Sequence, residues 1–304
     1  MRGWKWFSRY GIEAVQLPKL HTMAAWPLEP NERCFAMHLL EKDTAVRRLA
    51  ESSGYFAPIS ANWSINDLPN GGYLMAVLAR TMLHEATKKK IAIMTASFIA
   101  RGAPGDAHVL LEKVAASAQF ERFEARLVQN NAEKIRALGT FVDEEMDCAF
   151  NRYESAAPEV AALSQCIPIP PMPTLALYDQ VDVRLDPACA GWMHNRLADR
   201  SEFKGWIKFR DERPHDAVSL LVAADAFPPP VYASQSISAW VPTIELSVNI
   251  RKLPGSLWLK CVFRTRFVTC GLLEEDGEIW DEAGELIALS RQIAQYRPFG
   301  SSKR

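Results

Sequence analysis

A nine-residue signature occurs twice in this chain and constrains the fold more than any other feature. Residues 97–105 read SFIARGAPG and residues 247–255 read SVNIRKLPG, so four identical residues recur at the same spacing, 150 residues apart. Each copy follows a predicted helix and precedes a run of predicted strands. The repetition therefore predicts an internal duplication, in which the two halves of the chain share one fold.

The first half contains one predicted helix and four predicted strands. Apolar residues recur at spacings of three and four over residues 72–87, which is typical of an amphipathic helix. Lysines 88–90 follow it, where positive charge complements a helix C-terminus. β-rich segments separated by polar turns then predict strands over residues 91–101, 107–117, 119–129 and 134–143.

A proline-rich segment separates this half from the next. Residues 166–174 read CIPIPPMPT, which excludes a helix or a central strand because proline lacks the backbone N–H. The second half repeats the order of the first. Strands are predicted over residues 179–185 and 204–210, then a helix that Pro214 begins and the prolines at 228–230 end. Further strands follow over 243–252, 256–268, 271–281 and 285–296.

These elements predict an α+β fold of two units. We assign residues 1–29 to an N-terminal extension, 30–143 to the first unit, 144–178 to a linker and 179–304 to the second unit. Each unit would wrap an antiparallel sheet around one long apolar helix. The first 22 residues are basic and aromatic without the apolar core of a secretion signal, so we interpret them as an extension, with a membrane-surface or targeting segment as the alternative.

The composition restricts the class of partner. The chain is 48% hydrophobic and 23% charged, with a net charge of -1, so no overall field attracts nucleic acid. No apolar stretch reaches the ~18 residues that a membrane span needs. The six cysteines are scattered without a CxxC pair, which favours reduced thiols and a cytoplasmic protein.

Four segments in order resemble one family. They are WSINDLPNGG at residues 63–72, LLVAAD at 220–225, WVPTIEL at 240–246 and WDEAGELIALSRQ at 280–292. Together they resemble the helix entrances, the strand after the second helix and the last hairpin of double-hotdog acyl-CoA thioesterases, the thioesterase-like type II group. The similarity covers roughly residues 30–298.

The resemblance implies a tandem hotdog fold and hydrolysis of fatty acyl-CoA in fatty acid metabolism. The family's active site uses an aspartate on the second helix, a threonine on the next strand and a glutamine on the last strand. The matching residues are Asp225, Thr243 and Gln292. The resemblance also implies acyl-CoA as the partner, no cofactor or metal, and a homodimer or higher oligomer with more than ~1,000 Å² buried between units.

The chemistry of thioester hydrolysis suits these residues. Asp225 would lie in the last turn of its helix and point toward the core, where burial and the helix dipole would both raise the pKa of its carboxyl group. A carboxylate with a raised pKa is a better general base for water. The alternative is that Asp225 only bonds the turn before the prolines. Thr243 and Gln292 can each donate and accept hydrogen bonds and so orient one water molecule.

The first half lacks these three groups. In the aligned halves Thr243 matches Ile93 and Gln292 matches Phe141, and we expect both counterparts to be core residues. The helix start at Gly71 and Gly72 could still donate N–H groups to the substrate or bind an anion, or it could be only a tight turn into the helix.

Other candidates are weaker. Arg251 and Lys252, with other basic residues, could bind the phosphates of CoA, or they could form a solvated face. Met172, Leu175 and Leu177 of the linker could line an acyl channel or pack in the core. The sequence contains no HExxH metal motif and no GxSxG nucleophile elbow. A non-catalytic acyl-binding protein, or an enoyl-CoA hydratase on the same fold, stays the alternative function.

Overall fold

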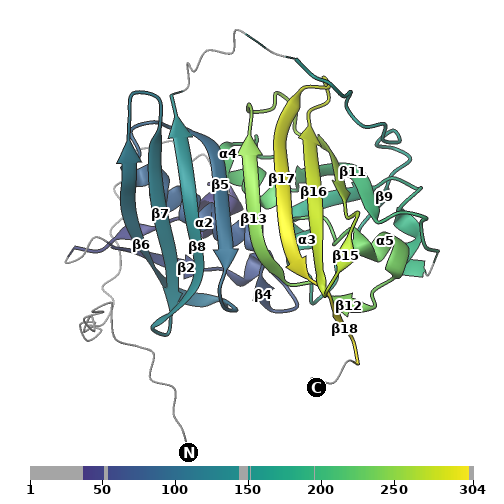
Figure 1. Ribbon diagram of the computed structural model, residues 1–304, viewed down its shortest axis with the longest axis horizontal. Helices are drawn as coiled ribbons and strands as arrows, with labels where there is room; N and C mark the ends of the chain where they lie inside the picture. The colour runs from purple at the N-terminus through teal and green to yellow at the C-terminus, as the bar shows by residue number, and fades with distance from the viewer. Residues whose placement is uncertain (1–36, 51–53, 144–149, 151, 195, 301–304) are drawn as a thin grey trace, which may run out of the picture. The chain divides into compact units, whose positions relative to one another are not determined.

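One antiparallel sheet of 14 strands runs through both halves of the chain (Figure 1). The computed structural model describes residues 37–50, 54–143, 150, 152–194 and 196–300, and the predicted extension over residues 1–29 lies outside them. The sheet order is β1-β2-β6-β7-β8-β5-β13-β17-β16-β14-β11-β10-β9, with β15 beside β16. The described residues form one compact unit.

The strands of the first half are β1 (Arg47–Arg48), β2 (Gly54–Ile59), β5 (Lys90–Phe98), β6 (Gly105–Ala116), β7 (Glu121–Gln129) and β8 (Ala132–Val142). Those of the second half are β9 (Ile167–Pro168), β10 (Val181–Leu185), β11 (Glu202–Phe209), β13 (Thr243–Ile250), β14 (Leu259–Arg264), β15 (Val268–Thr269), β16 (Leu272–Trp280) and β17 (Leu286–Gln295). Two small ribbons pair β3 (Ser64–Ile65) with β4 (Leu68–Pro69), and β12 (Ala239–Trp240) with β18 (Arg297–Pro298).

The two halves meet at the pairing of β5 with β13. On either side of this pair the strand order is the same, since β8, β7, β6 and β2 match β17, β16, β14 and β11. Ala96 on β5 pairs with Leu246 on β13, and these are the two positions that the 150-residue repeat makes equivalent. The antiparallel sheets of the two halves are therefore joined edge to edge into one continuous sheet, because the equivalent edge strands bond to each other.

The helices cover one face of the sheet. They are α1 (Leu39–Asp43), α2 (Gly71–Glu85), α3 (Leu177–Gln180), α4 (Ala217–Ala223) and α5 (Val231–Gln235), with 3-10 turns at Ala61–Trp63 and Ala190–His194. Helix α2 begins at Asn70, whose side chain accepts from the backbone N–H of Tyr73, and ten of its residues are buried. Helix α4 begins with a capping box between Asp216 and Ser219.

The prediction of two long helices is confirmed only for the first. Helix α4 spans seven residues and ends at Ala223, before the three prolines. The carbonyl of Asp225 accepts a hydrogen bond of 2.7 Å from the Asn70 side chain. The amide of Asn70, from the first half, thus supplies the donor that the backbone of a further helical turn would otherwise supply. The position of Asp225 in the last turn is therefore also wrong, because the residue lies beyond the helix end.

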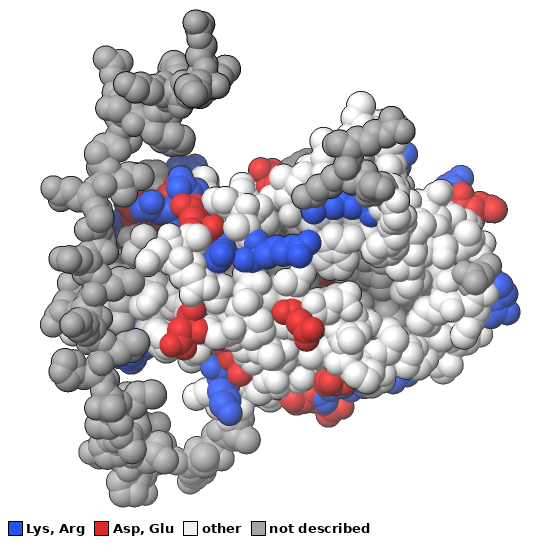
Figure 2. Space-filling view, turned by 90° about the horizontal axis from the view of Figure 1, so that it is seen from below, with Lys and Arg blue, Asp and Glu red and all other residues white. Residues whose placement is uncertain are grey.

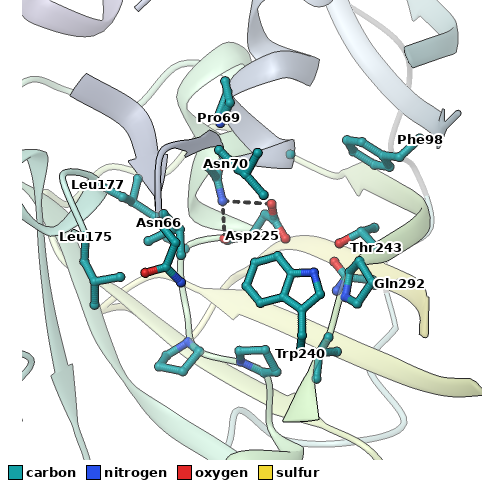
Figure 3. A pocket seen from close by; sticks show the side chains of 18 of the residues that line it. Asn66, Pro69, Asn70, Phe98, Leu175, Leu177, Asp225, Trp240, Thr243 and Gln292 are labelled. Atoms are coloured by element: carbon teal, nitrogen blue, oxygen red, sulfur yellow. Dashed lines mark hydrogen bonds between the residues drawn. The ribbon is translucent and has the colours of Figure 1, made fainter. Parts of the chain in front are cut away.

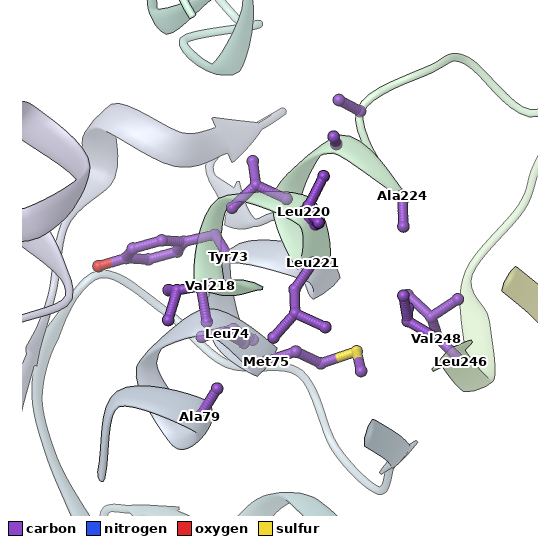
Figure 4. Close-up of a cluster of buried hydrophobic side chains, with 14 of the residues drawn as sticks. Tyr73, Leu74, Met75, Ala79, Val218, Leu220, Leu221, Ala224, Leu246 and Val248 are labelled. Atoms are coloured by element: carbon purple, nitrogen blue, oxygen red, sulfur yellow. The ribbon is translucent and has the colours of Figure 1, made fainter. Parts of the chain in front are cut away.

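Helices α2 and α4 pack closely against each other, and α4 also packs against β13 (Figure 4). Met75 and Leu221 lie side by side there, next to Leu246 and Val248 of β13. At Gly72 the backbones of α2 and α4 are so close that an added Cβ atom would lie 2.3 Å from the carbonyl oxygen of Leu221. Only glycine allows this approach.

The predicted strands are confirmed with shifts of a few residues, with one strand shorter than predicted and one short strand added. The strand predicted over residues 256–268 is shorter, with Leu259, Cys261 and Phe263 buried but Leu257 exposed, because regular pairing with β11 begins at Leu259. The proline-rich segment contributes β9, which bonds only at the sheet edge, as proline requires.

The two counterparts in the first half differ in burial. Phe141 is fully buried and packs edge-to-face on Phe123, as predicted. Ile93 is 39% exposed on the outer face of the sheet, so its prediction as a core residue is wrong. The ladder between β5 and β8 shifts register between Ile91 and Ile93, and this irregularity turns Ile93 outward.

The substitution Phe141→Ala should lower the free energy of unfolding by about 3–5 kcal/mol, because it leaves a cavity in the core. Ile93→Ala is the matched control and should lower it by less than about 1 kcal/mol. Urea denaturation followed by tryptophan fluorescence measures both. Equal losses in the two variants would contradict the assignment of the inner and outer faces.

The substitution Gly72→Ala should lower the free energy of unfolding by about 1–3 kcal/mol or more, because the new methyl group overlaps the Leu221 carbonyl. Gly255→Ala is the control, since no atom lies within 4 Å of a Cβ atom built there. Thermal unfolding of both variants gives the comparison. A Gly72→Ala protein as stable as the Gly255→Ala protein would disprove the close helix contact.

Candidate active site

A cavity of about 650 Å³ opens where the two halves meet at the ends of α2 and α4. Its lining is mainly apolar and comes from the loop before α2, the segment after β5, the proline-rich segment, the residues after α4 and the inner face of β13, β17 and β16. The apolar part includes Leu68, Leu74, Phe98, Ile169, Met172, Leu175, Leu177, Trp192, Phe227, Tyr232 and Trp240. Met172, Leu175 and Leu177, the predicted channel residues, all line this cavity.

Asp225 lies in this cavity and is held by the first half of the chain (Figure 3). Its Oδ2 accepts hydrogen bonds from the Asn70 side chain at 2.8 Å and from the backbone N–H of Gly72 at 2.9 Å. The carboxylate therefore lies at the N-terminus of α2, the positive end of that helix dipole. The expectation that a helix dipole disfavours its charge is wrong, because Asp225 faces the start of α2 and lies beyond the end of α4.

Two opposing effects set the pKa of Asp225. Burial raises it, and the hydrogen bonds from Gly72, Gly71 and Asn70 to the charged form lower it. Burial is the larger effect, and the pKa rises to about 6. The carboxyl group is thus mainly ionised at neutral pH yet holds a proton more readily than an exposed aspartate does.

Thr243 and Gln292 lie across the cavity from Asn70, on the other side of Asp225 (Figure 3). Thr243 begins β13, next to a register irregularity between Thr243 and Glu245. Gln292 is on the inner face of β17 and is buried. Among the described residues, neither the Thr243 hydroxyl nor the Gln292 amide has a hydrogen-bond partner, so both groups are available to a ligand in the cavity.

The four predicted substrate-binding residues separate into two places. Gly71 and Gly72 lie beside Asp225 and donate to its carboxylate. Arg251 and Lys252 follow the opposite end of β13 from Thr243 and do not line this cavity, and Lys252 pairs with Glu285 at 3.2 Å.

The basic residues on the cavity lining are Arg101 and Arg297, both exposed. Arg101 is the repeat equivalent of Arg251. Figure 2 views the molecule from the end that carries β4, β12 and β18, and on this face charges of both signs are scattered over a mostly uncharged surface.

Among the polar residues of the cavity that sequence reasoning missed are Asn70 and Glu275. Asn70 belongs to the PNGG helix entrance, but its bonds to Asp225 cross 155 residues of sequence. Glu275 lies on the inward face of β16. Its alternation with Leu273 and Ile279, which are apolar residues of the same face, is the sequence signal that could have identified it.

The described residues contain no cluster of three or more His, Cys, Asp or Glu side chains that could hold a metal ion. They also contain no helix that is both long and apolar enough to cross a membrane. Four described cysteines are free thiols, of which Cys166, Cys189 and Cys261 are buried and Cys270 is exposed.

Solved structures of three bacterial proteins are similar to this chain. A candidate thioesterase II from Thermobifida fusca YX has a TM-score of 0.77 at 25% identity, over 86% of this chain and 98% of that one. A protein with the hot dog fold from Alicyclobacillus acidocaldarius also gives 0.77, at 19% identity over 86% and 99%. An acyl-CoA thioesterase II from Mycobacterium marinum gives 0.68, at 16% identity over 86% and 100%. The fold is therefore a hotdog fold.

Two family models match the sequence in order. Residues 59–142 match the N-terminal domain of acyl-CoA thioesterases, and residues 156–296 match their C-terminal domain. No curated protein is significantly similar to this chain in sequence. Because both domains of one family follow each other and together span most of the sequence, the chain belongs to the acyl-CoA thioesterase family.

Proposed function

We propose that this protein hydrolyses fatty acyl-CoA to a free fatty acid and CoA, with Asp225 as the general base. One observation carries the proposal: a partly buried carboxylate with a pKa near 6 lies in a mainly apolar cavity, opposite two polar side chains that no described residue bonds. A pKa just below neutral suits a base that removes a proton from water. The apolar lining suits an acyl chain.

The reaction begins with a water molecule held among the three polar groups. The Asp225 carboxylate takes a proton from this water, and the resulting hydroxide attacks the thioester carbonyl carbon. Thr243 and Gln292 fix the water by accepting and donating hydrogen bonds, which supplies the positional part of the catalysis. The tetrahedral intermediate then collapses, and the C–S bond to CoA breaks.

Asn70, Gly71 and Gly72 hold the base in place. Three donors on one carboxylate fix its orientation and favour its charged form, against the effect of burial. We therefore assign the N–H groups of the two glycines first to Asp225, and their direct contact with substrate stays a prediction.

For the phosphates of CoA we propose Arg101 and Arg297, because both lie on the cavity lining. A role of Arg251 and Lys252 stays a prediction that would require a second substrate position. The pairing of two chains, which the family resemblance implies, also stays a prediction, and light scattering at micromolar concentration would test it.

The substitution Asp225→Asn should lower kcat for a long-chain acyl-CoA by about 100-fold or more, the size of general-base effects. KM should change little, because Asp225 acts on the water. Release of CoA is measured with a thiol reagent over a series of acyl chain lengths. The variant should fold. Because the pKa of Asp225 is raised in the folded protein, ionisation of this side chain lowers the stability as the pH rises through about 6, and the neutral asparagine side chain avoids this loss.

Thr243→Ala and Gln292→Ala should each lower kcat by about tenfold. Each should combine with Asp225→Asn less than additively, because all three groups act on one water molecule. Near-normal turnover in a folded Asp225→Asn protein would show that the base is another residue.

The value of kcat/KM should also depend on pH, and Asn70 should set the midpoint of this dependence. In the wild type, kcat/KM should rise with pH through a midpoint near 6, as Asp225 loses its proton. The Asn70 hydrogen bond favours the carboxylate, so Asn70→Ala should raise the pKa and move this midpoint upward by about one pH unit.

Asn70→Ser separates this effect from helix capping. Serine keeps an acceptor for the N–H of Tyr73 at the start of α2, but it is too short to reach the Asp225 carboxylate. It should give the same shift in the midpoint with a smaller loss of stability. An unchanged midpoint in both variants would contradict the role of Asn70.

A further inference from the structure

Glu275 is a second acidic residue in the active-site cavity. It lies on the inner face of β16 between Leu273 and Gly277, and it is only 6% exposed. In the sheet it pairs directly with Gln292 of β17. An apolar residue would suit this position better, because a buried carboxyl group loses its hydration.

Glu275 has no partner among the described residues. The acids beside it on β16 point to the outer face and are all bonded: Glu274 accepts from backbone N–H groups, Asp276 pairs with Arg291 and Glu278 pairs with Arg264. Buried carboxyl groups without donors are uncommon, because an unmet hydrogen bond costs free energy. The position of Glu275 therefore requires an explanation other than stability.

The counterpart of Glu275 in the first half of the chain is an acid whose role is structural. Gln292 matches Phe141 in the repeat, and as Gln292 pairs with Glu275, Phe141 pairs with Glu121 on β7. Glu121 is also buried, but it accepts from the backbone N–H groups of Thr87 and Lys88 at 2.8 and 2.9 Å and from Lys113 Nζ at 2.9 Å. It is a fully bonded carboxylate.

The counterparts of Lys113 and Thr87 do not donate to Glu275. Lys113 pairs with Phe123 and Phe263 pairs with Gly277, so Phe263 occupies the place of the lysine. Thr87 is the first residue after the C-cap of α2, and the first residue after the C-cap of α4 is Asp225. An aromatic ring thus stands in place of the cation, and the residue that matches Thr87 carries a second carboxyl group.

The protonation of the two acids differs accordingly. Glu121, with three donors, has a pKa lowered to about 2. Burial raises the pKa of Glu275 well above its ordinary value, and the nearby charges of Asp225 and Asp276 raise it further. The other titratable groups on the cavity lining are Arg101, Arg297, Tyr178 and Tyr232, and burial keeps both tyrosines neutral. The cavity therefore holds two acids of different strength: Asp225, whose charged form accepts hydrogen bonds from Asn70 and Gly72, and Glu275, which binds its proton more strongly than an exposed glutamate does.

We propose that Glu275 is a second catalytic residue of this site, the general acid that protonates the departing sulfur of CoA. The assignment rests on the proposed thioesterase function. Asp225 takes one proton from water, and the hydroxide forms the new C–O bond. As the C–S bond breaks, the electron pair goes to sulfur, which takes the proton of Glu275. The proton on Asp225 then passes to Glu275 and restores the starting state, so that thioester and water give acid and thiol.

The test compares two leaving groups in the variant Glu275→Gln, which keeps the shape of the protonated side chain but cannot give up a proton. For an acyl-CoA, whose alkyl thiolate is strongly basic, kcat should fall about 100-fold or more. For an acyl thiophenyl ester, whose aryl thiolate needs little protonation, kcat should fall less than about tenfold. The wild type should also lose kcat/KM at alkaline pH as Glu275 ionises, and the variant should lack this alkaline limb.

Two further variants complete the test. Glu121→Gln, the repeat counterpart, should lower the melting temperature without changing the ratio of the two substrates' rates. Glu275→Leu should raise the melting temperature, because an apolar side chain replaces an unpaired carboxyl group, and should show the same dependence on leaving group as Glu275→Gln. It serves as the test if the glutamine variant does not fold.

The outcomes separate the two proposals. The general-acid assignment is overturned if the wild type is active and the Glu275 variants lower kcat for both substrates by the same factor. It is also overturned if they lower kcat for neither substrate. In both cases the thioesterase function stays intact. A wild type that releases no thiol from either ester overturns the proposed function, and the assignment falls with it.

Discussion

The hydrogen bonds between β5 and β13 are the interaction on which the rest of the structure depends. They join the two halves into one sheet and bring the start of α2 to the end of α4, where Gly72 touches Leu221. The cavity lies at this junction, and Asp225 from one half is held by Asn70 from the other. Neither half therefore contains the candidate site alone, although all four candidate catalytic side chains belong to the second half.

Much of the fold followed from local patterns in the sequence. The repeat signature correctly related β5 to β13, and helical spacing predicted α2 to within two residues of its ends. Strand β2 was missed, because GYFAPI has no clear alternation and contains Pro58, which argues against a strand. The length of α4 was overestimated because the prolines set only an outer limit, and the tertiary bond from Asn70 to the Asp225 carbonyl sets the actual end.

The candidate site was predictable in its parts but not in its connections. Asp225, Thr243 and Gln292 line one cavity, as their shared role requires. The bond from Asn70 was not predictable, because it depends on helix packing across 155 residues. Glu275 was not recognised because an acid on a strand of alternating pattern reads as an exposed residue. The register with Gln292 fixes its inward position.

The joining of both halves in one chain has a consequence for how such a site can evolve. In a symmetric dimer of single units, one gene encodes both subunits, so a change that favours catalysis on one side also alters the other. In the fused chain the equivalent positions mutate separately. Phe141 can pack the core while Gln292 faces the cavity, and Glu121 can be fully bonded while Glu275 bonds no residue that the structure describes. One half preserves stability, and the other is free to accept residues that stability alone would reject.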